Sequence, residues 1–196
     1  MTTVRAVLAL GGNLGDRKQI IKSAIRALKN TEGIEVVAKS PLVESHALTE
    51  AGVDESRPNY LNGVVEVETS LKPGDLLDRV REIEQEHGRV RLERWGSRTL
   101  DIDIITYGSL IKDGKRLTLP HPRAFERAFV TVPWSLMNPD AVLPGHGSVA
   151  SLAAGCQQNL RKTVAAIDSA YSAGEYDRAA KRAETALADN GDDAQD

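Results

Sequence analysis

Hydrophobic and polar residues alternate along the chain with two different spacings. Four segments have the apolar runs or the strict alternation of β-strands, at residues 4–10, 34–44, 60–68 and 100–105. Two segments have apolar residues three and four positions apart, as amphipathic helices do, at residues 16–30 and 73–88. In chain order these elements read β-α-β-β-α-β. We therefore predict an α+β fold, a ferredoxin-like α/β sandwich with a largely antiparallel sheet.

Local signals mark the ends of the two helices. Asp16 begins a pattern that resembles a capping box, and Pro73 suits the first turn of the second helix, which Gly88 ends. The glycine-rich segment 11–15 lacks the GxGxxG spacing and the Lys-Ser/Thr ending of phosphate loops, so we interpret it as a tight turn. Residues 45–58 show no apolar periodicity and are predicted to form a loop.

Length, charge and cysteine content limit the classes of protein that fit. The 196 residues can bury one sizeable core, which we place at residues 1–156, followed by an alanine-rich helical extension with a frayed acidic end at residues 157–196. The net charge of −3 argues against general nucleic-acid binding. Cys156 is the only cysteine, and no apolar run approaches the roughly 18 residues of a membrane span. We therefore expect a cytoplasmic protein without a disulfide bond.

A cluster of cations directly precedes the last predicted strand. Residues 89–98 contain a single acidic residue, Glu93. The same stretch contains four arginines, Arg89, Arg91, Arg94 and Arg98. Planar guanidinium groups suit phosphate oxygens. On the strand itself, Asp101 and Asp103 point to the same side, because side chains alternate between the two faces of a strand. Together the arginines and the aspartates predict a site for a polyphosphate with its metal ions.

The two aspartates also predict the metal. Residues on the same face of a strand lie about 6.6 Å apart at Cα, close enough for two carboxylates to hold one hard cation or to bridge two. Magnesium needs only one or two protein carboxylates besides water and phosphate oxygens. Taken alone, Asp-x-Asp on a strand is also typical of two solvated acids, and an arginine cluster is typical of a charged surface loop. Their combination favours a nucleotide site.

Four short motifs occur in order along the chain, LGGNLGDR, PNYLN, RVRLERWGSRTLDIDII and LPHPRAFERAFVTVPW. In this order they resemble the 6-hydroxymethyl-7,8-dihydropterin pyrophosphokinase family of folate biosynthesis, over roughly residues 4–144. The resemblance implies transfer of a pyrophosphoryl group from ATP to the hydroxymethyl group of the pterin, which gives AMP and the pterin diphosphate. It also implies two Mg²⁺ ions as cofactors, with ATP and hydroxymethyldihydropterin as small-molecule partners.

By matching position, the resemblance assigns the phosphate half of the site. The implied metal ligands are Asp101 and Asp103, the implied catalytic cations are Arg89 and Arg98, and the implied ATP contacts are Arg91, Arg98, His121 and Arg127. Fixed cations suit the charge that spreads over a transferring phosphoryl group. Arg81 and Glu84, on the second predicted helix, receive no role.

The resemblance assigns the pterin half of the site as well. The residues that match pterin-binding positions are Ser45, Tyr60, Asn62, Trp95 and Phe129. A flat heteroaromatic ring gains from stacking on both faces, here by Tyr60 and Phe129, and the amide of Asn62 can donate and accept hydrogen bonds at the ring edge. Ser45 is followed by His46 where many relatives have Thr-Pro in the pterin wall. Without the resemblance, Phe129 would be interpreted as a core residue.

Two other functions fit parts of the pattern. Paired aspartates on a ferredoxin-like sheet also serve other two-metal enzymes, such as nucleotidyl transferases. An aromatic residue between arginines also suits an RNA-binding module, although the net acidity and the low aromatic content argue against it. The favoured interpretation is the pyrophosphokinase, without nucleic-acid or membrane partners. An association with neighbouring folate enzymes is a further expectation.

Overall fold

The strands and helices follow the predicted order. The computed structural model describes residues 2–49, 52–54, 56–88, 98–156 and 160–164. Its central elements are β1 (Val4–Gly12), α1 (Arg17–Lys29), β2 (Ile34–Lys39), β3 (Leu42–Ser45), β6 (Tyr60–Thr69), α2 (Pro73–Glu86) and β7 (Asp101–Tyr107). With β2 and β3 together in the place of one strand, this is the β-α-β-β-α-β order.

The strands of the main sheet pair antiparallel. They lie in the order β10-β3-β6-β1-β7, where β10 is Leu160–Val164, and β2 also pairs with β6. β1 lies between β6 and β7, with Val4 opposite Thr69 of β6 and Leu10 opposite Ile102 of β7. Both neighbours of β1 therefore begin where β1 ends. The prediction of a ferredoxin-like sandwich is confirmed.

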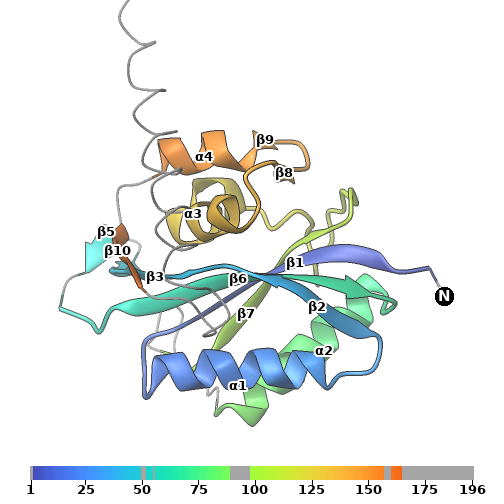
Figure 1. The fold of residues 1–196 in the computed structure, drawn as a ribbon, viewed down its shortest axis with the longest axis horizontal. Coiled ribbons are helices and arrows are strands. Elements are labelled where there is room, and N and C mark those ends of the chain that lie inside the picture. The colour runs from blue at the N-terminus through green and yellow to red at the C-terminus, as the bar shows by residue number, and fades with distance from the viewer. Residues whose placement is uncertain (1, 50–51, 55, 89–97, 157–159, 165–196) are drawn as a thin grey trace, which may run out of the picture.

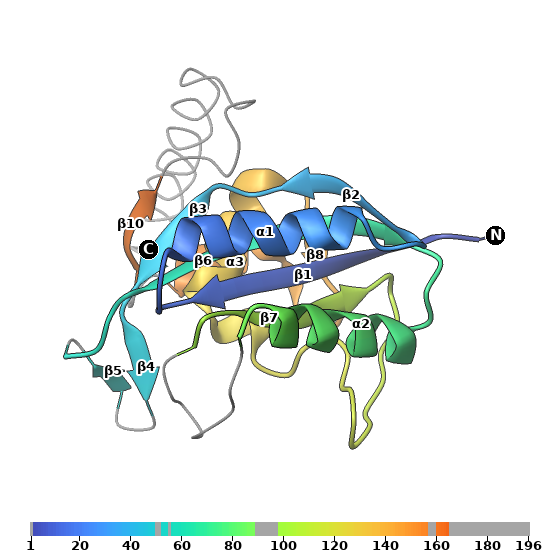
Figure 2. The same ribbon diagram turned by 90° about the horizontal axis from the view of Figure 1, so that it is seen from below.

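Helices cover both faces of this sheet (Figure 1). α1 and α2 lie side by side on one face (Figure 2) and pack on Leu10 of β1 and on the other apolar residues of that face. α3 (Ala128–Met137) covers the other face, and α4 (Val149–Gly155) packs on α3 (Figure 1). Val7 and Ile105, on this face of the sheet, belong to a second core. Alternate residues of one strand thus enter two separate cores, as period-two alternation requires.

Both predicted helices begin and end as their signals indicate. The Asp16 carboxylate accepts a hydrogen bond from the Gln19 backbone N–H (3.1 Å) at the start of α1. α2 begins at Pro73, and Gly88 follows its end with a φ of +75°, in the left-handed region that favours glycine. The apolar stripes are buried, with Ile21, Ala24, Ile25 and Leu28 in α1 and Leu76, Leu77, Val80 and Ile83 in α2.

Replacement of Asp16 by alanine should lower the free energy of unfolding by about 1 kcal/mol, because the first turn of α1 loses its capping acceptor. Asp16→Asn keeps an acceptor oxygen at the same place and should stay close to the wild type. Urea denaturation of both variants measures the difference. Equal stability of the alanine and asparagine variants would show that the hydrogen bond to the Gln19 N–H contributes nothing.

The long strand predicted at residues 34–44 is divided in two, so this prediction is wrong. Pro41 has no backbone N–H to donate to a neighbouring strand. Ser40 forms the junction: its backbone N–H donates to the Val64 carbonyl (2.8 Å), and its hydroxyl oxygen accepts from the Val64 N–H (2.8 Å). β2 and β3 therefore both pair with β6, on either side of Ser40.

Several short elements were not predicted. The loop expected at residues 45–58 contains a hairpin of two short strands, β4 (Ala47–Thr49) and β5 (Gly52–Asp54). After β7 come η1 (Ala124–Glu126), α3, the paired strands β8 (Val142–Leu143) and β9 (Gly147–Ser148), and α4. Pro133 lies inside α3, and most residues of this helix are apolar, so no stripe of helical period marks it in the sequence.

The described part of the C-terminal segment is a strand. Leu160–Val164, expected at the start of a helix, forms β10, which pairs antiparallel with β3 at the edge of the main sheet. The remaining residues of the expected helical extension, 157–159 and 165–196, lie outside the described residues, and the domain boundary at residue 156 stays a prediction. None of the described helices has both the length and the apolar character that crossing a membrane requires.

Candidate active site

Asp101 and Asp103, the aspartate pair, lie on β7 at the edge of the sheet. Asp103 is opposite Ala9 of the neighbouring strand β1. Ile102 and Ile104, which alternate with the two aspartates, are buried in the core below α1 and α2. The two carboxylates therefore share the opposite face, as the sequence predicts, and both remain partly exposed.

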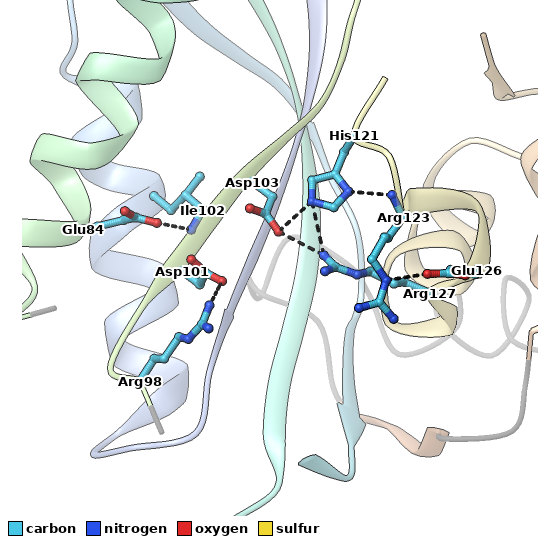
Figure 3. A network of polar contacts seen from close by, with 9 residues as sticks. All are labelled: Glu84, Arg98, Asp101, Ile102, Asp103, His121, Arg123, Glu126 and Arg127. Carbon is cyan, nitrogen blue, oxygen red and sulfur yellow. Dashed lines mark hydrogen bonds and ion pairs between the residues drawn. The ribbon is translucent and has the colours of Figure 1, made fainter. Parts of the chain in front are cut away.

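An arginine contacts each carboxylate (Figure 3). Arg98 Nη1 donates to Asp101 Oδ2, and Arg127 Nη1 donates to Asp103 Oδ2 at 3.1 Å. The two arginines come from different segments: Arg98 precedes β7, and Arg127 is the residue before α3. This edge of the sheet thus presents a row of two carboxylates and two guanidinium groups. Such a row can bind cations at the carboxylates and phosphate oxygens at the guanidinium groups.

His121 is the third group at Asp103. Its Nε2 atom lies 3.6 Å from Asp103 Oδ2, and its Nδ1 atom accepts a hydrogen bond from the Arg123 backbone N–H (3.1 Å). Burial lowers the pKa of the His121 imidazole, against a smaller opposing effect of Asp103. The imidazole is therefore neutral at pH 7, with Nδ1 as acceptor and the proton on Nε2, the nitrogen that faces Asp103.

A cavity of about 130 Å³ opens beside the aspartate pair. Tyr60, at the start of β6, and Phe129, in α3, both line it, so we call it the aromatic cavity. The Arg127 guanidinium lies 5.6 Å from the centroid of the Phe129 ring. Of the residues that the sequence assigns to the site, those that line this cavity are Ser45, Tyr60, Asn62, Arg98, Asp101, Asp103, Arg127 and Phe129.

The amide of Asn62 is held in one orientation at the wall of the aromatic cavity. Asn62 is buried on β6, and its Nδ2 donates to the hydroxyl oxygen of Ser45 at 3.1 Å. On the other side, a Cβ atom at Gly11 would come within 2.5 Å of Asn62 Oδ1. Ser45 at the end of β3 and Gly11 near the end of β1 therefore set the orientation of this amide together.

Gly11→Ala should distort the aromatic cavity, because the added methyl group would overlap Asn62 Oδ1. The amide must then move and give up its hydrogen bond to Ser45, and crowding of this kind typically costs about 1–3 kcal/mol. Urea denaturation measures this loss. Gly74→Ala is the matched control, because nothing lies within 4 Å of a Cβ at Gly74 in α2. Equal stability of both variants and the wild type would contradict the close contact at Gly11.

A second cavity, of about 270 Å³, lies on the other side of the edge strand. Arg81, Lys115 and Arg116 give it positive charge, and we call it the basic cavity. His121 lines it together with apolar residues such as Leu117. The aspartate pair lines this cavity as well as the aromatic one. The two cavities therefore meet at the same two carboxylates, since both sides of an edge strand are accessible.

Some of these residues received no role from the sequence. Glu84 is 3% exposed and accepts a hydrogen bond from the Ile102 backbone N–H (2.7 Å), between the two aspartates. It thereby holds β7 against α2 (Figure 3). Arg81 lies one turn earlier on the same helix and lines the basic cavity with Lys115 and Arg116. In the sequence, only a position beside the apolar stripe of α2 distinguishes Glu84 and Arg81. Many solvated helix residues have such a position, so it does not identify a site residue.

The aspartate pair fits magnesium by the chemistry of its oxygens. Among the residues that the structure describes, no group of three or more His, Cys, Asp or Glu side chains could hold a metal ion. Magnesium takes one or two protein carboxylates and completes its shell with water and phosphate oxygens. The pair therefore suits magnesium that binds together with phosphate. The other expected site residues, Arg89, Arg91 and Trp95, lie in segment 89–97, outside the described residues.

Similar proteins are known for most of the chain. Residues 7–139 match the family model described as 7,8-dihydro-6-hydroxymethylpterin-pyrophosphokinase (HPPK). The 2-amino-4-hydroxy-6-hydroxymethyldihydropteridine pyrophosphokinase of Haemophilus influenzae is 39% identical over 149 residues, which are 76% of this chain and 91% of that protein. The enzyme of the same name from Pseudomonas aeruginosa is 41% identical over 152 residues, 78% of this chain and 91% of that protein.

A solved structure shares the fold. Plasmodium falciparum HPPK-DHPS with pteroate matches with a TM-score of 0.61 at 14% sequence identity. The match covers 82% of this chain and 48% of that chain, so this protein spans about half the length of the solved one.

Proposed function

The chain belongs to the 7,8-dihydro-6-hydroxymethylpterin-pyrophosphokinase family of ATP-dependent enzymes in folate biosynthesis, and we propose that its two cavities divide the substrates between them. The reaction transfers a pyrophosphoryl group from ATP to the hydroxymethyl group of 6-hydroxymethyl-7,8-dihydropterin. In our proposal the pterin binds in the aromatic cavity and ATP in the basic cavity. The observation that carries this proposal is that the aspartate pair lines both cavities.

The aromatic cavity offers the groups that a pterin needs. Tyr60 and Phe129 line this cavity, and their aromatic rings could stack on the two faces of a flat heteroaromatic molecule. The oriented amide of Asn62, supported by Ser45, can donate and accept along the ring edge. Burial raises the pKa of the Tyr60 phenol, so this wall stays neutral at physiological pH.

The basic cavity suits the nucleotide. Lys115 and Arg116 can neutralise phosphate charge, and apolar residues such as Leu117 offer surface for a base. His121 carries its proton on Nε2 and can donate it in a hydrogen bond to a phosphate oxygen. Phosphates that extend from this cavity to the aspartate pair would reach the pterin in the neighbouring cavity.

Electrostatics and positioning would supply most of the rate. Two magnesium ions held by the aspartate pair would screen the phosphate charge. Arg98 and Arg127 add fixed positive charge beside the carboxylates, where negative charge develops during transfer. His121 already has a proton on the nitrogen that faces Asp103, so it does not act as a base there. Correct placement of the pterin hydroxyl then becomes decisive.

Three further residues enter the proposal through their motif positions alone. Arg89 is proposed as a second catalytic cation, Arg91 as an ATP contact and Trp95 as a pterin contact. The match to the pyrophosphokinase family does not favour the two alternatives, another two-metal nucleotidyl-transfer enzyme and an RNA-binding module.

Release of AMP from MgATP, measured with and without 6-hydroxymethyl-7,8-dihydropterin, tests the proposed reaction. We expect AMP only when the pterin is present, in equal amount to the pterin diphosphate. AMP formed with another acceptor, and not with the pterin, would indicate a different nucleotidyl or pyrophosphoryl transfer. A folded protein that forms no AMP under any of these conditions would overturn the proposal.

We also propose that the protein works in the cytoplasm beside other enzymes of folate synthesis. The single cysteine suits a reducing compartment. The solved HPPK-DHPS protein, about twice as long as the part matched here, supports a physical association of such enzymes. Co-purification of the tagged protein from its own cells tests this, and recovery of the protein alone would count against it.

A further inference from the structure

Asn13 lies where three segments of the active site meet. It directly follows β1 and is 4% exposed. Its Oδ1 accepts a hydrogen bond from the Arg98 backbone N–H at 2.7 Å, and its Nδ2 donates to the Pro58 carbonyl at 3.2 Å. Its own backbone N–H donates to the Arg98 carbonyl at 2.9 Å. One amide side chain thus connects segments 85 and 45 residues away along the chain.

The sheet topology explains why one residue reaches both segments. β1 lies between β6 and β7 and is antiparallel to both, so both neighbours begin where β1 ends. Pro58 lies just before the start of β6, and Arg98 lies just before the start of β7. Neither residue belongs to a strand ladder. Pairing within the sheet therefore does not set their positions. Contacts from the segment after β1 do: the contacts of Asn13 reach both residues, and the Leu14 N–H donates to the Arg98 carbonyl as well (3.2 Å).

The two segments carry different parts of the site. Pro58 leads directly to Tyr60, a wall of the aromatic cavity. The next carbonyl, that of Asn59, accepts a hydrogen bond from Arg17 Nη1 at 2.6 Å. Arg17, the first residue of α1, therefore supports the same segment as Asn13. Arg98 carries the guanidinium that donates to Asp101. Asn13 lines neither cavity, yet it connects an aromatic wall to a cation beside the aspartate pair.

We propose that Asn13 is a positioning residue that fixes the segment of Tyr60 relative to the segment of Arg98, and therefore the pterin relative to the phosphates. This inference rests on the proposed function of the two cavities. An amide is required because one contact needs an acceptor and the other a donor, whereas a carboxylate has acceptors only. A misplacement of about 1 Å can cost on the order of 100-fold in rate, so the contacts of Asn13 matter although it touches no substrate.

The two side-chain contacts can be removed in two steps. Asn13→Asp keeps an oxygen for the Arg98 N–H but removes the donor to the Pro58 carbonyl. KM for the pterin should then rise about tenfold, while KM for ATP stays within about twofold. Asn13→Ala removes both side-chain contacts, so kcat should also fall by about 100-fold. Asn30→Asp makes the same chemical change at the exposed end of α1 and should leave all three constants unchanged.

A merely structural role predicts a different result. Loss of folded protein would lower kcat in proportion and leave both KM values unchanged, which thermal denaturation of the same samples would reveal. Hydrogen exchange gives a readout that does not depend on activity. Amides of residues 59–61 should exchange faster in Asn13→Asp, and those of residues 98–100 as well in Asn13→Ala.

The outcomes separate this inference from the proposed function. Equal changes in the two KM values, or exchange rates like those of the wild type, would overturn the positioning role of Asn13. A wild-type protein without pterin-dependent AMP formation would overturn the proposed function instead. In that case the exchange rates still decide whether Asn13 fixes the two segments.

Discussion

Asp103→Asn should lower kcat for pterin-dependent AMP formation by about a thousandfold. The substitution keeps the shape of the side chain and removes its negative charge. Asp103 has more contacts in the site than a single ion pair. Its Oδ2 lies 3.1 Å from Arg127 Nη1 and 3.6 Å from His121 Nε2. Asp103 also lines both cavities. Without the charge, the proposed magnesium site keeps a single protein carboxylate, that of Asp101.

AMP release at saturating ATP and pterin, over a series of magnesium concentrations, measures this effect. Asp140→Asn is the matched control, because Asp140 is exposed, follows α3 and is not among the residues that line the two cavities. We expect normal turnover from the control and a near-wild-type free energy of unfolding from both variants. A loss of less than about tenfold at saturating magnesium would argue against Asp103 as a metal ligand.

Arg98→Ala should lower kcat by about 100-fold to 1,000-fold, with smaller changes in either KM. The guanidinium donates to Asp101 Oδ2 and lines the aromatic cavity, so it lies at the junction of the proposed substrate sites. Its guanidinium is oriented before substrates bind by the contact with Asp101, and its backbone is held by Asn13. A cation that is already oriented stabilises the developing charge without reorganisation.

Arg98→Lys separates charge from geometry. Lysine keeps the positive charge but has no planar fork, so we expect an intermediate rate. Arg26→Ala, at an exposed position of α1, is the control for loss of an arginine. The ion pair to Asp101 is partly exposed, so stability should change by no more than about 1 kcal/mol. Unchanged turnover in Arg98→Ala with intact substrate binding would remove Arg98 from the mechanism.

Local patterns were sufficient for much of the fold. α1 and α2 were predicted because each has an apolar stripe and a local end signal, the Asp16 cap in α1 and the Pro73 start and Gly88 end in α2. The division of the strand at Ser40 was missed because apolar residues resume directly after Pro41, at Leu42 and Val43, and continue the pattern of a single strand. α3 was missed because it is apolar on most sides and contains Pro133, and β10 because Leu160–Val164 also has a helical spacing.

The sequence by itself determined that Asp101 and Asp103 share one face of a strand, because side-chain alternation depends only on the backbone of that strand. It also placed arginines next to them. Only the tertiary structure decided that Tyr60, Asn62 and Phe129 line the same cavity as the aspartates, since this requires the strand order β6-β1-β7 and α3 on one face. The second cavity, the orientation of Asn62 and the contacts of Asn13 likewise depend on segments that are distant in the chain. Such contacts arise from packing of the whole sheet, and no local pattern encodes them.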